Sequence, residues 1–575
     1  MINNALLNRI RSLAASLYGC DEADDIVQLV STLIGKQPIK EERQTQLTQA
    51  DCILITYGDL LRREGTPPLR VLHEFLTEHL KGTVSAVHIL PFYPYSSDDG
   101  FSVVDYWQVN DELGSWDDVS RIAQDFDLMV DAVVNHISAE STWFKAYLRG
   151  EPEYQDYFIE ADPSLDYSQV VRPRALPLLT EFETSMGRRY LWTTFSADQI
   201  DLNFASPKVL KEWIKLFFFY IQQGARFIRL DAVGFLWKQL GTSCIHLPQT
   251  HQVVQLLRAV AELADPSTKI ITETNVPHRD NISYFGDGRN EAHLVYQFPL
   301  PPLVLHTFIT RDCRALSQWA QTLDDPPGEA TFLNFLASHD GVGVMPVVDL
   351  LSTEERDLMI ETIKRRGGYV SYKHNPDGTE SPYELNINYL SALFEPGDPQ
   401  EHAVRRFLAA HSILLSLMGV PAIYMHSMLG SLNYEEGVRS SGIKRRINRE
   451  KLSYAAVVEE LTQPRSIRSQ VFAGIRHMLE IRKNHRAFDP KAPQEILCLN
   501  NSVFTVKRGS RELGIVISLN NVSAKPETVF LSKQVLNGAL HAVDLLTSVS
   551  YSTTSGGLEL TLQPYQACWL RIFDG

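Results

Sequence analysis

The stretch Phe227–Gly234, which reads FIRLDAVG, decides the fold predicted for this chain of 575 residues. It begins as an apolar, β-rich run, presents charged residues and ends at a glycine, which is typical of a buried parallel strand that stops at a reactive surface. Asp231 is expected at the carboxyl end of the strand, where barrel enzymes carry their chemistry. Arg229 points to the same side, where its guanidinium favours an ionised, oriented carboxylate. On this stretch alone, a buried Asp–Arg pair that only ties two strands together is an equal alternative.

Similar strand-like runs alternate with helical stretches over most of the chain. The other predicted strands are Cys52–Tyr57, Ser85–Pro91, Leu128–Asn135, Lys269–Glu273, His293–Phe298, Phe332–Ser338 and Pro421–Met425. Helical periodicity lies between strands, as at Pro207–Gln223 and Thr250–Leu263. Eight strands with intervening helices predict a closed (β/α)8 TIM barrel. An open doubly wound sheet is the alternative, which is weakened because no GxGxxG motif follows an early strand.

Four regions are expected outside the regular barrel. Residues 1–50 are predicted to form an N-terminal helical extension that precedes the catalytic barrel at 51–488. Two insertions interrupt the barrel, at about 138–195 after the third strand and at 343–399 after the seventh, and long irregular insertions usually act as lids or functional loops. Short β-runs over residues 489–575 predict a C-terminal antiparallel β domain.

Composition restricts the class of protein. Hydrophobic content of 44% and charged content of 21% are ordinary for a folded soluble protein. The net charge of −15 argues against nucleic acid or an anionic membrane as a partner. The six cysteines form no CxxC pair and are expected to be reduced thiols of a cytoplasmic protein. No signal peptide is recognised at the start, and the strongest apolar run, Leu216–Ile221, is too short to span a bilayer.

Acidic or imidazole side chains follow three further predicted strands, at Glu273, at His339–Asp340 and at Asn135–His136. Each signal is weak alone, because a lone histidine is more often structural, but the carboxyl ends of barrel strands all meet at one end. Scattered capping of the core does not explain why acids recur there. Several carboxylates with arginines and histidines favour glycosyl transfer, in which one carboxylate attacks the anomeric carbon and another protonates the leaving oxygen.

In this order, these residues resemble the α-amylase superfamily and, within it, the sucrose phosphorylase branch. Further matching stretches, between about residues 50 and 450, are His88–Phe92, Asp98–Phe101, Trp192–Ser196, Gly241–Cys244 and Ile447–Arg449. The resemblance implies that Asp231 is the nucleophile that forms a β-glucosyl ester, Glu273 the general acid/base and Asp340 the transition-state stabiliser. It implies that glucose is held by Asp98, His136, Arg229, His339 and Arg445, between the aromatic side chains of Phe101 and Phe195. Asp231 must then be ionised and Glu273 protonated at the outset.

Phosphate as the second nucleophile is implied by a further likeness to this branch. Arg172-Pro173-Arg174 resembles its arginine loop, and Arg174 and Tyr383 match its phosphate-contacting pair. Surface salt bridges are the alternative reading of Arg172 and Arg174. With phosphate, two inversions would convert an α-glucoside into α-glucose 1-phosphate with net retention.

The acceptor site departs from plain sucrose phosphorylases. Glu384 stands where those enzymes carry glutamine, Asn275 where histidine is common, and Phe235 where tyrosine is found. Arg172–Leu179 and Thr272–His278 look more like glucosylglycerate phosphorylases, which implies reversible phosphorolysis of 2-O-α-D-glucosyl-D-glycerate. Glucosylglycerol phosphorylase and sucrose phosphorylase are the alternatives, since Glu384 can accept hydrogen bonds from glycerol hydroxyls. The candidate cations for the glycerate carboxylate are Lys373, His278 and Arg279.

A different class, an inactive amylase-like subunit that binds sugars or partners, is disfavoured because Asp231, Glu273 and Asp340 are all present. No cofactor and no metal are expected, because the first insertion lacks the dense Asp/Asn cluster that calcium needs and the branch resembles metal-free enzymes. The expected partners are small molecules: the glucoside, inorganic phosphate and glucose 1-phosphate. The sequence leaves monomer and homodimer open.

Overall fold

The computed structural model describes residues 3–36, 43–173, 176–374, 379–395 and 397–573, and its centre is a closed barrel of parallel strands. Around the barrel the strands follow the order β1-β16-β12-β11-β10-β9-β4-β3. They are β1 (Ile53–Thr56), β3 (Ala86–Ile89), β4 (Asp127–Val133), β9 (Ala225–Asp231), β10 (Lys269–Thr272), β11 (Leu294–Tyr296), β12 (Thr331–Asn334) and β16 (Val420–Tyr424). Each contains one of the eight predicted runs or overlaps it. The predicted (β/α)8 barrel is confirmed, and the open sheet is excluded.

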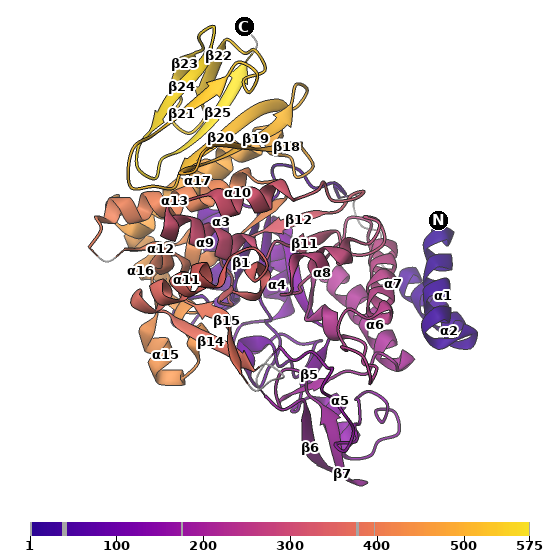
Figure 1. Cartoon of the computed structure of the whole chain (residues 1–575). Coiled ribbons are helices and arrows are strands. Elements are labelled where there is room, and N and C mark those ends of the chain that lie inside the picture. Colours follow the sequence, from indigo (N-terminus) through magenta and orange to yellow (C-terminus); the bar gives the residue numbers. More distant parts are fainter. Residues whose placement is uncertain (1–2, 37–42, 174–175, 375–378, 396, 574–575) are drawn as a thin grey trace.

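Helices cover the outside of the barrel (Figure 1), which explains why its strands read as continuous apolar runs. The principal helices are α3 (Pro68–His79), α4 (Trp116–Asp125), α6 (Pro207–Gln222), α7 (Pro248–Ala264), α9 (Leu300–Thr310), α10 (Arg314–Gln321), α13 (Gln400–Ser416) and α17 (Ile467–Lys483). Several, such as α6 and α7, begin with proline in the first turn, where its missing N–H costs no hydrogen bond. Apolar side chains such as Trp213 and Phe217 of α6 are fully buried.

Register brings the functional ends of the strands together. In the pairing of β4 with β9, Asp131 lies opposite Arg229 and Val133 opposite Asp231. The next strand, β10, pairs Thr272 with Leu230. Residues that follow β4, β9 and β10 therefore leave the barrel at the same end, which is the end where barrel enzymes place their chemistry.

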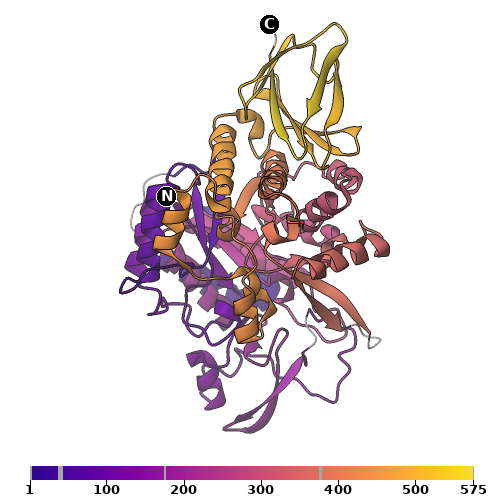
Figure 2. The ribbon, with the colours of Figure 1, turned by 90° about the vertical axis from the view of Figure 1, so that its left-hand side faces the viewer.

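Two insertions project from that end, as Figures 1 and 2 show. The first carries β5 (His136–Ser138), α5 (Thr142–Leu148), β6 (Leu179–Thr184), β7 (Gly187–Trp192) and β8 (Gln199–Asp201). The second carries β13 (Val342–Gly343), α11 (Thr353–Arg365), β14 (Tyr369–His374), β15 (Glu380–Asn386) and α12 (Tyr389–Leu393). Its strands form a three-stranded sheet in the order β13-β15-β14.

The two ends of the chain pack elsewhere. Helices α1 (Asn4–Tyr18) and α2 (Cys20–Gly35) lie on the outside near α6 and α7, where Tyr18 donates a hydrogen bond to the carbonyl of Phe204 at 2.8 Å. No helix among the described ranges has the length and apolarity needed to cross a membrane.

Beyond α17 the chain forms the C-terminal antiparallel strands that the sequence predicts, at the end of the barrel away from the insertions (Figures 1 and 2). These strands are β18 (Gln494–Asn500), β19 (Val503–Ser510), β20 (Gly514–Asn521), β21 (Glu527–Ser532), β22 (His541–Asp544), β23 (Ser550–Ser552), β24 (Gly557–Leu562) and β25 (Ala567–Phe573). Part of this region has its own apolar core, and Trp569 ties it to the barrel by donating a hydrogen bond to Ser412 of α13 at 2.8 Å.

Candidate active site

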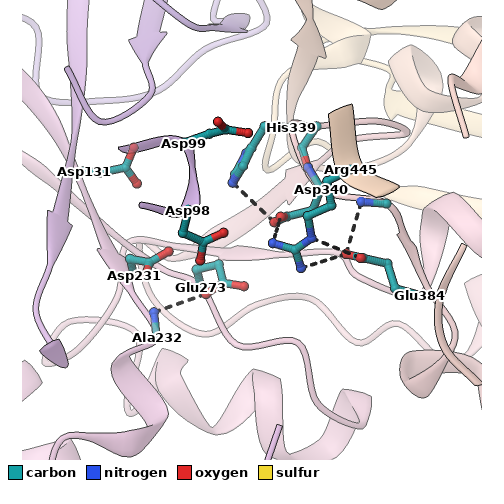
Figure 3. Close-up of polar contacts among 12 residues, drawn as sticks. Asp98, Asp99, Asp131, Asp231, Ala232, Glu273, His339, Asp340, Glu384 and Arg445 are labelled. Carbon is teal, nitrogen blue, oxygen red and sulfur yellow. Dashed lines mark hydrogen bonds and ion pairs between the residues drawn. The ribbon is translucent and has the colours of Figure 1, made fainter. Parts of the chain in front are cut away.

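A cavity of about 210 Å³ opens at the carboxyl ends of the barrel strands, and residues from both insertions complete its wall. The residues predicted for the site that line it are Asp98, Phe101, His136, Phe195, Arg229, Asp231, Glu273, Asn275, His339, Asp340, Tyr383, Glu384 and Arg445. Lys373 also lines the cavity, whereas His278 and Arg279 are not among its lining residues. Arg174 lies outside the described residues. Side chains from distant parts of the sequence thus converge on one space (Figure 3).

Arg229 and Asp131 form the buried base of the site. Arg229 Nη1 donates to Asp231 Oδ1 at 2.6 Å and to Asp131 Oδ1 at 2.5 Å. The other oxygen of Asp131 lies 2.7 Å from His88 Nε2. Burial raises the pKa of the Asp131 carboxyl, but its interactions with His88 and the guanidinium of Arg229 outweigh burial and hold the pKa at about 2. Asp131 is therefore ionised and fixes the position of Arg229.

Glu273 reaches the same guanidinium from the neighbouring strand. Its Oε2 lies 3.9 Å from Arg229 Nη2 and accepts a hydrogen bond from the backbone N–H of Ala232 at 3.2 Å. Ala232 adopts a left-handed conformation, with φ of 55°, which is unfavourable for a residue with a β-carbon and is common where function requires a strained turn. The turn after β9 thus points a backbone N–H at Glu273.

Asp231 and Glu273 titrate as a pair. Burial raises the pKa of Asp231 to about 8 despite the opposing charge of Arg229. Burial also raises the pKa of Glu273, with a contribution from the negative charge of Asp340. Arg229 favours the ionised form of Asp231, as the sequence indicates, but its Nη1 is shared with Asp131. With both pKa values raised, the two carboxyls retain a proton near neutral pH, and the 2.6 Å contact of Arg229 with Asp231, against 3.9 Å to Glu273, favours the negative charge on Asp231.

Arg445 bridges two acidic groups on the opposite wall (Figure 3). Its Nη1 lies 2.6 Å from Asp340 Oδ1, while Nε and Nη2 bind both carboxylate oxygens of Glu384 at 3.0 and 2.9 Å. Burial opposes ionisation of Asp340, but Arg445 outweighs it and holds the pKa of this carboxyl well below its usual range. Asp340 is therefore an anion at all ordinary pH values.

Glu384 is almost fully buried, with 3% of its surface exposed, and the backbone N–H of Gly341 also donates to its Oε1 at 3.1 Å. A β-carbon at position 341 would lie 2.6 Å from both Glu384 Cγ and the Leu385 carbonyl oxygen, so the close approach requires glycine. Both carboxylate oxygens of Glu384 are already engaged. The main role of Glu384 in the structure is therefore to hold Arg445, and the contact with acceptor hydroxyls expected from the sequence is secondary.

Aromatic rings form the remaining walls. Phe101 stacks on the imidazole of His339, with centroids 4.7 Å apart and an angle of 8° between the planes. Burial lowers the pKa of His339 to about 3, so this ring is neutral at pH 7. Phe195 packs against His136 at 5.1 Å and against Phe235 at 5.5 Å. These flat, partly apolar surfaces suit the faces of a pyranose ring.

Two contributing residues were missed from the sequence. Asp131 lies within the predicted run Leu128–Asn135 and could have been found, because an isolated charge in a buried strand requires a partner. Gln199 of β8 donates to Asp98 Oδ2 at 3.2 Å and lies 3.2 Å from His136 Nε2. It belongs to no recognisable motif, and only the pairing of β8 with β5 brings it to the site.

The chemistry of the site is that of acids, guanidinium groups and imidazoles around a pocket of sugar size. Within the described ranges, no group of three or more His, Cys, Asp or Glu side chains is placed to hold a metal ion. Asp231 and Glu273 lie beside one guanidinium, so both can reach the same bound group. A nucleophilic carboxylate and a protonated carboxyl in one site can break a glycosidic bond.

Comparison with known proteins assigns the chain to the family that its sequence resembles. Residues 78–349 match the α-amylase catalytic domain. Over 99% of both chains, the sequence is 50% identical to the glucosylglycerate phosphorylase of Spirochaeta thermophila. It is 30% identical to the sucrose phosphorylase of Agrobacterium vitis, over 76% of this chain and 88% of that one. The crystal structure of sucrose 6F-phosphate phosphorylase from Thermoanaerobacter thermosaccharolyticum superposes with a TM-score of 0.73 at 22% identity, over 91% of this chain and 99% of that one. The chain therefore belongs to the α-amylase family and, within it, to the group of the glucosylglycerate phosphorylases.

Proposed function

We propose that the protein catalyses the reversible, retaining phosphorolysis of 2-O-α-D-glucosyl-D-glycerate to α-D-glucose 1-phosphate and D-glycerate. The observation that carries the proposal is the 50% identity, over 99% of both chains, to a protein named glucosylglycerate phosphorylase. The site supports it, since Asp231, Glu273 and Asp340 line one cavity. An inactive sugar-binding subunit has no need of all three acids in one place.

In the first half of the reaction, Asp231 attacks the anomeric carbon from the β face. Glu273 gives its proton to the oxygen of the leaving glycerate, and a β-glucosyl ester of Asp231 forms. Asp340 is an anion beside the cavity and stabilises the positive charge that develops on the sugar ring. Asp98, His136, His339 and Arg445 hold the sugar hydroxyls, between Phe101 and Phe195.

In the second half, phosphate takes the place that glycerate has left. Glu273, now ionised, accepts a proton from phosphate as a phosphate oxygen attacks the anomeric carbon, and the bond to Asp231 breaks. Two inversions give α-glucose 1-phosphate. Tyr383, which lines the cavity, and Arg174 are the proposed phosphate contacts, with Arg172 in the same loop.

Two other acceptors, glycerol and fructose, stand as alternatives to glycerate. Fructose is disfavoured because the relative named sucrose phosphorylase is 30% identical over 76% of the chain, against 50% over 99% for the one named glucosylglycerate phosphorylase. Glycerol was suggested by Glu384, but the oxygens of this carboxylate are engaged by Arg445 and Gly341. Glycerol and fructose are uncharged and need no cation at the acceptor site, whereas the carboxylate of glycerate does.

The experiment is an acceptor panel in the direction of synthesis. Purified protein receives α-glucose 1-phosphate with D-glycerate, glycerol or fructose, and phosphate release is measured, with Asp231→Asn as the inactive control. We expect the highest kcat/KM with glycerate and an α-linked product by NMR. A ranking with glycerate last would overturn the assignment, and a β-linked product would overturn the retaining mechanism.

A further inference from the structure

Glycerate differs from glycerol by a carboxylate, and this inference rests on the function proposed above. A buried carboxylate needs a cation that is not already neutralised. The cations and imidazoles that line the cavity are Arg172, Arg229, Arg445, Lys373, His136, His246 and His339. The group that binds the acceptor carboxylate should be the one whose positive charge is not already paired with an acid of the site.

Two of the arginines are committed to acids of the site. Arg229 bonds to Asp131 and Asp231, and Arg445 bonds to Asp340 and to both oxygens of Glu384. Neither offers a net positive charge to a new anion. Burial lowers the pKa of His339 to about 3 and that of His246 to about 4, so both imidazoles are neutral at pH 7. His136 is engaged on the donor side, where its Nε2 lies 3.0 Å from the carbonyl oxygen of Phe101 and 3.2 Å from Gln199 Nε2.

Lys373 has a different environment. It lies on β14, which pairs with β15, the strand that carries Tyr383 and Glu384 into the cavity. Among the residues that the structure describes, none forms a hydrogen bond or ion pair with its ammonium group. Burial lowers the pKa of Lys373, and no carboxylate within the described ranges acts in the opposite direction. We propose that Lys373 is the specificity residue that binds the carboxylate of glycerate.

Arg172 is the competing cation. Its side chain is exposed, and its guanidinium donates to the carbonyl of Leu176. The sequence stretch Arg172-Pro173-Arg174 is the one proposed to bind phosphate. Lys373 instead lies beside Tyr383 and Glu384 on the second insertion, and the other two candidates, His278 and Arg279, are not in the cavity wall. Separate cations then serve the two anions that alternate at the acceptor side.

The test compares Lys373→Met with Lys373→Arg and with Lys364→Met, using the full chain and α-glucose 1-phosphate as donor. Lys364 is a matched control, because it lies on α11 of the same insertion, is half exposed and pairs with Glu361. For Lys373→Met we expect kcat/KM with D-glycerate to fall about 10- to 100-fold, the range for a lost hydrogen bond to a charged group. Activity with glycerol should be unchanged or higher, and Lys373→Arg should restore part of the preference for glycerate.

Three results would overturn the proposal. One is an equal loss with glycerate and glycerol in Lys373→Met, which would indicate a general effect on the cavity. Another is an unchanged ratio of glycerate to glycerol with a raised KM for phosphate in phosphorolysis, which would assign Lys373 to phosphate. The third is loss of the glycerate preference in Arg172→Gln but not in Lys373→Met. Failure of the proposed function is distinct from all three, because the unmodified protein itself would then show no preference for glycerate.

Discussion

The two sides of the cavity are built in contrasting ways. On the donor side, Arg229, Asp231 and Asp131 stand on barrel strands, and Arg229 is shared between two acids at 2.5 and 2.6 Å. On the acceptor side, Lys373 and Arg172 stand on insertions, and neither has an acidic partner within the described part of the chain. One side receives the same glucosyl group in every half-reaction, so its charges can be satisfied permanently. The other must exchange glycerate for phosphate, so its cations remain available.

The largest effect should follow from removing the nucleophile. Asp231→Asn should lower turnover on the order of 10³-fold or more with every acceptor, because the covalent ester cannot form. Phosphate release from α-glucose 1-phosphate, with protein folding checked by circular dichroism, measures it. A loss confined to a single acceptor would contradict the division between donor and acceptor sides.

Removing the anchor of Arg229 should have the next largest effect. Asp131→Asn leaves Arg229 and His88 without their ionised partner, which should lower kcat about 100-fold and the free energy of unfolding by about 3–5 kcal/mol. In the unmodified protein the pKa of Asp131 is held at about 2, so its contribution to stability is present at neutral pH and is lost as the pH falls from about 4 to about 2.

Urea unfolding at pH 7 and pH 3 measures whether the loss of stability in Asp131→Asn depends on the ionised form of Asp131. The stability difference between Asp131→Asn and the unmodified protein should be smaller at pH 3. A difference that does not depend on pH would show that the ionised form of Asp131 is not what stabilises the site.

Breaking the Arg445 bridge should have a smaller effect. Glu384→Gln keeps the shape of the side chain but removes the charge that holds Arg445 Nε and Nη2, so we expect about a 10-fold rise in KM for glucose 1-phosphate. Initial rates over a range of donor concentrations measure it. The glycerate-to-glycerol ratio should change little, and a reversal of that ratio would place Glu384, rather than Lys373, in charge of acceptor choice.

The smallest predicted effect is a pH dependence. Burial raises the pKa of Asp231, which titrates with Glu273, to about 8, so the pair loses its shared proton as the pH rises through that value. Glu273 then cannot protonate the leaving group, and kcat/KM should fall about fourfold between pH 7 and pH 8.5. The fall should be the same for glycerate and glycerol, because it belongs to the donor side. An alkaline limb that shifts in Lys373→Met would instead link it to the acceptor.

The strands and the acids at their ends could be predicted from sequence because burial on both faces leaves a clear apolar run, and the barrel brings the ends together. Strand limits were less accurate. The run Phe332–Ser338 continues four residues past the end of β12, because Phe335 packs against Tyr296, the last residue of β11, and against Phe298. Apolar side chains there give the same signal as a strand.

The contacts between side chains across the site could not be predicted from the sequence. That Arg229 serves two acids, or that Glu384 is held by Arg445, depends on contacts between residues 98 or 61 positions apart. Gln199 reaches Asp98 only through the fold of the first insertion. For the same reason Lys373 was one of three candidate cations for the acceptor, and only the cavity wall separates it from His278 and Arg279.

The close fit at Gly341 limits where acceptor preference can be redesigned. Any side chain there would push against Glu384 Cγ and the Leu385 carbonyl oxygen at 2.6 Å, displace the bridge to Arg445 and damage the hold on the donor sugar. Libraries that aim at new acceptors should therefore keep positions 341 and 384 constant and vary β14 around Lys373. Variants made there alter the incoming molecule while the glucosyl pocket keeps its shape.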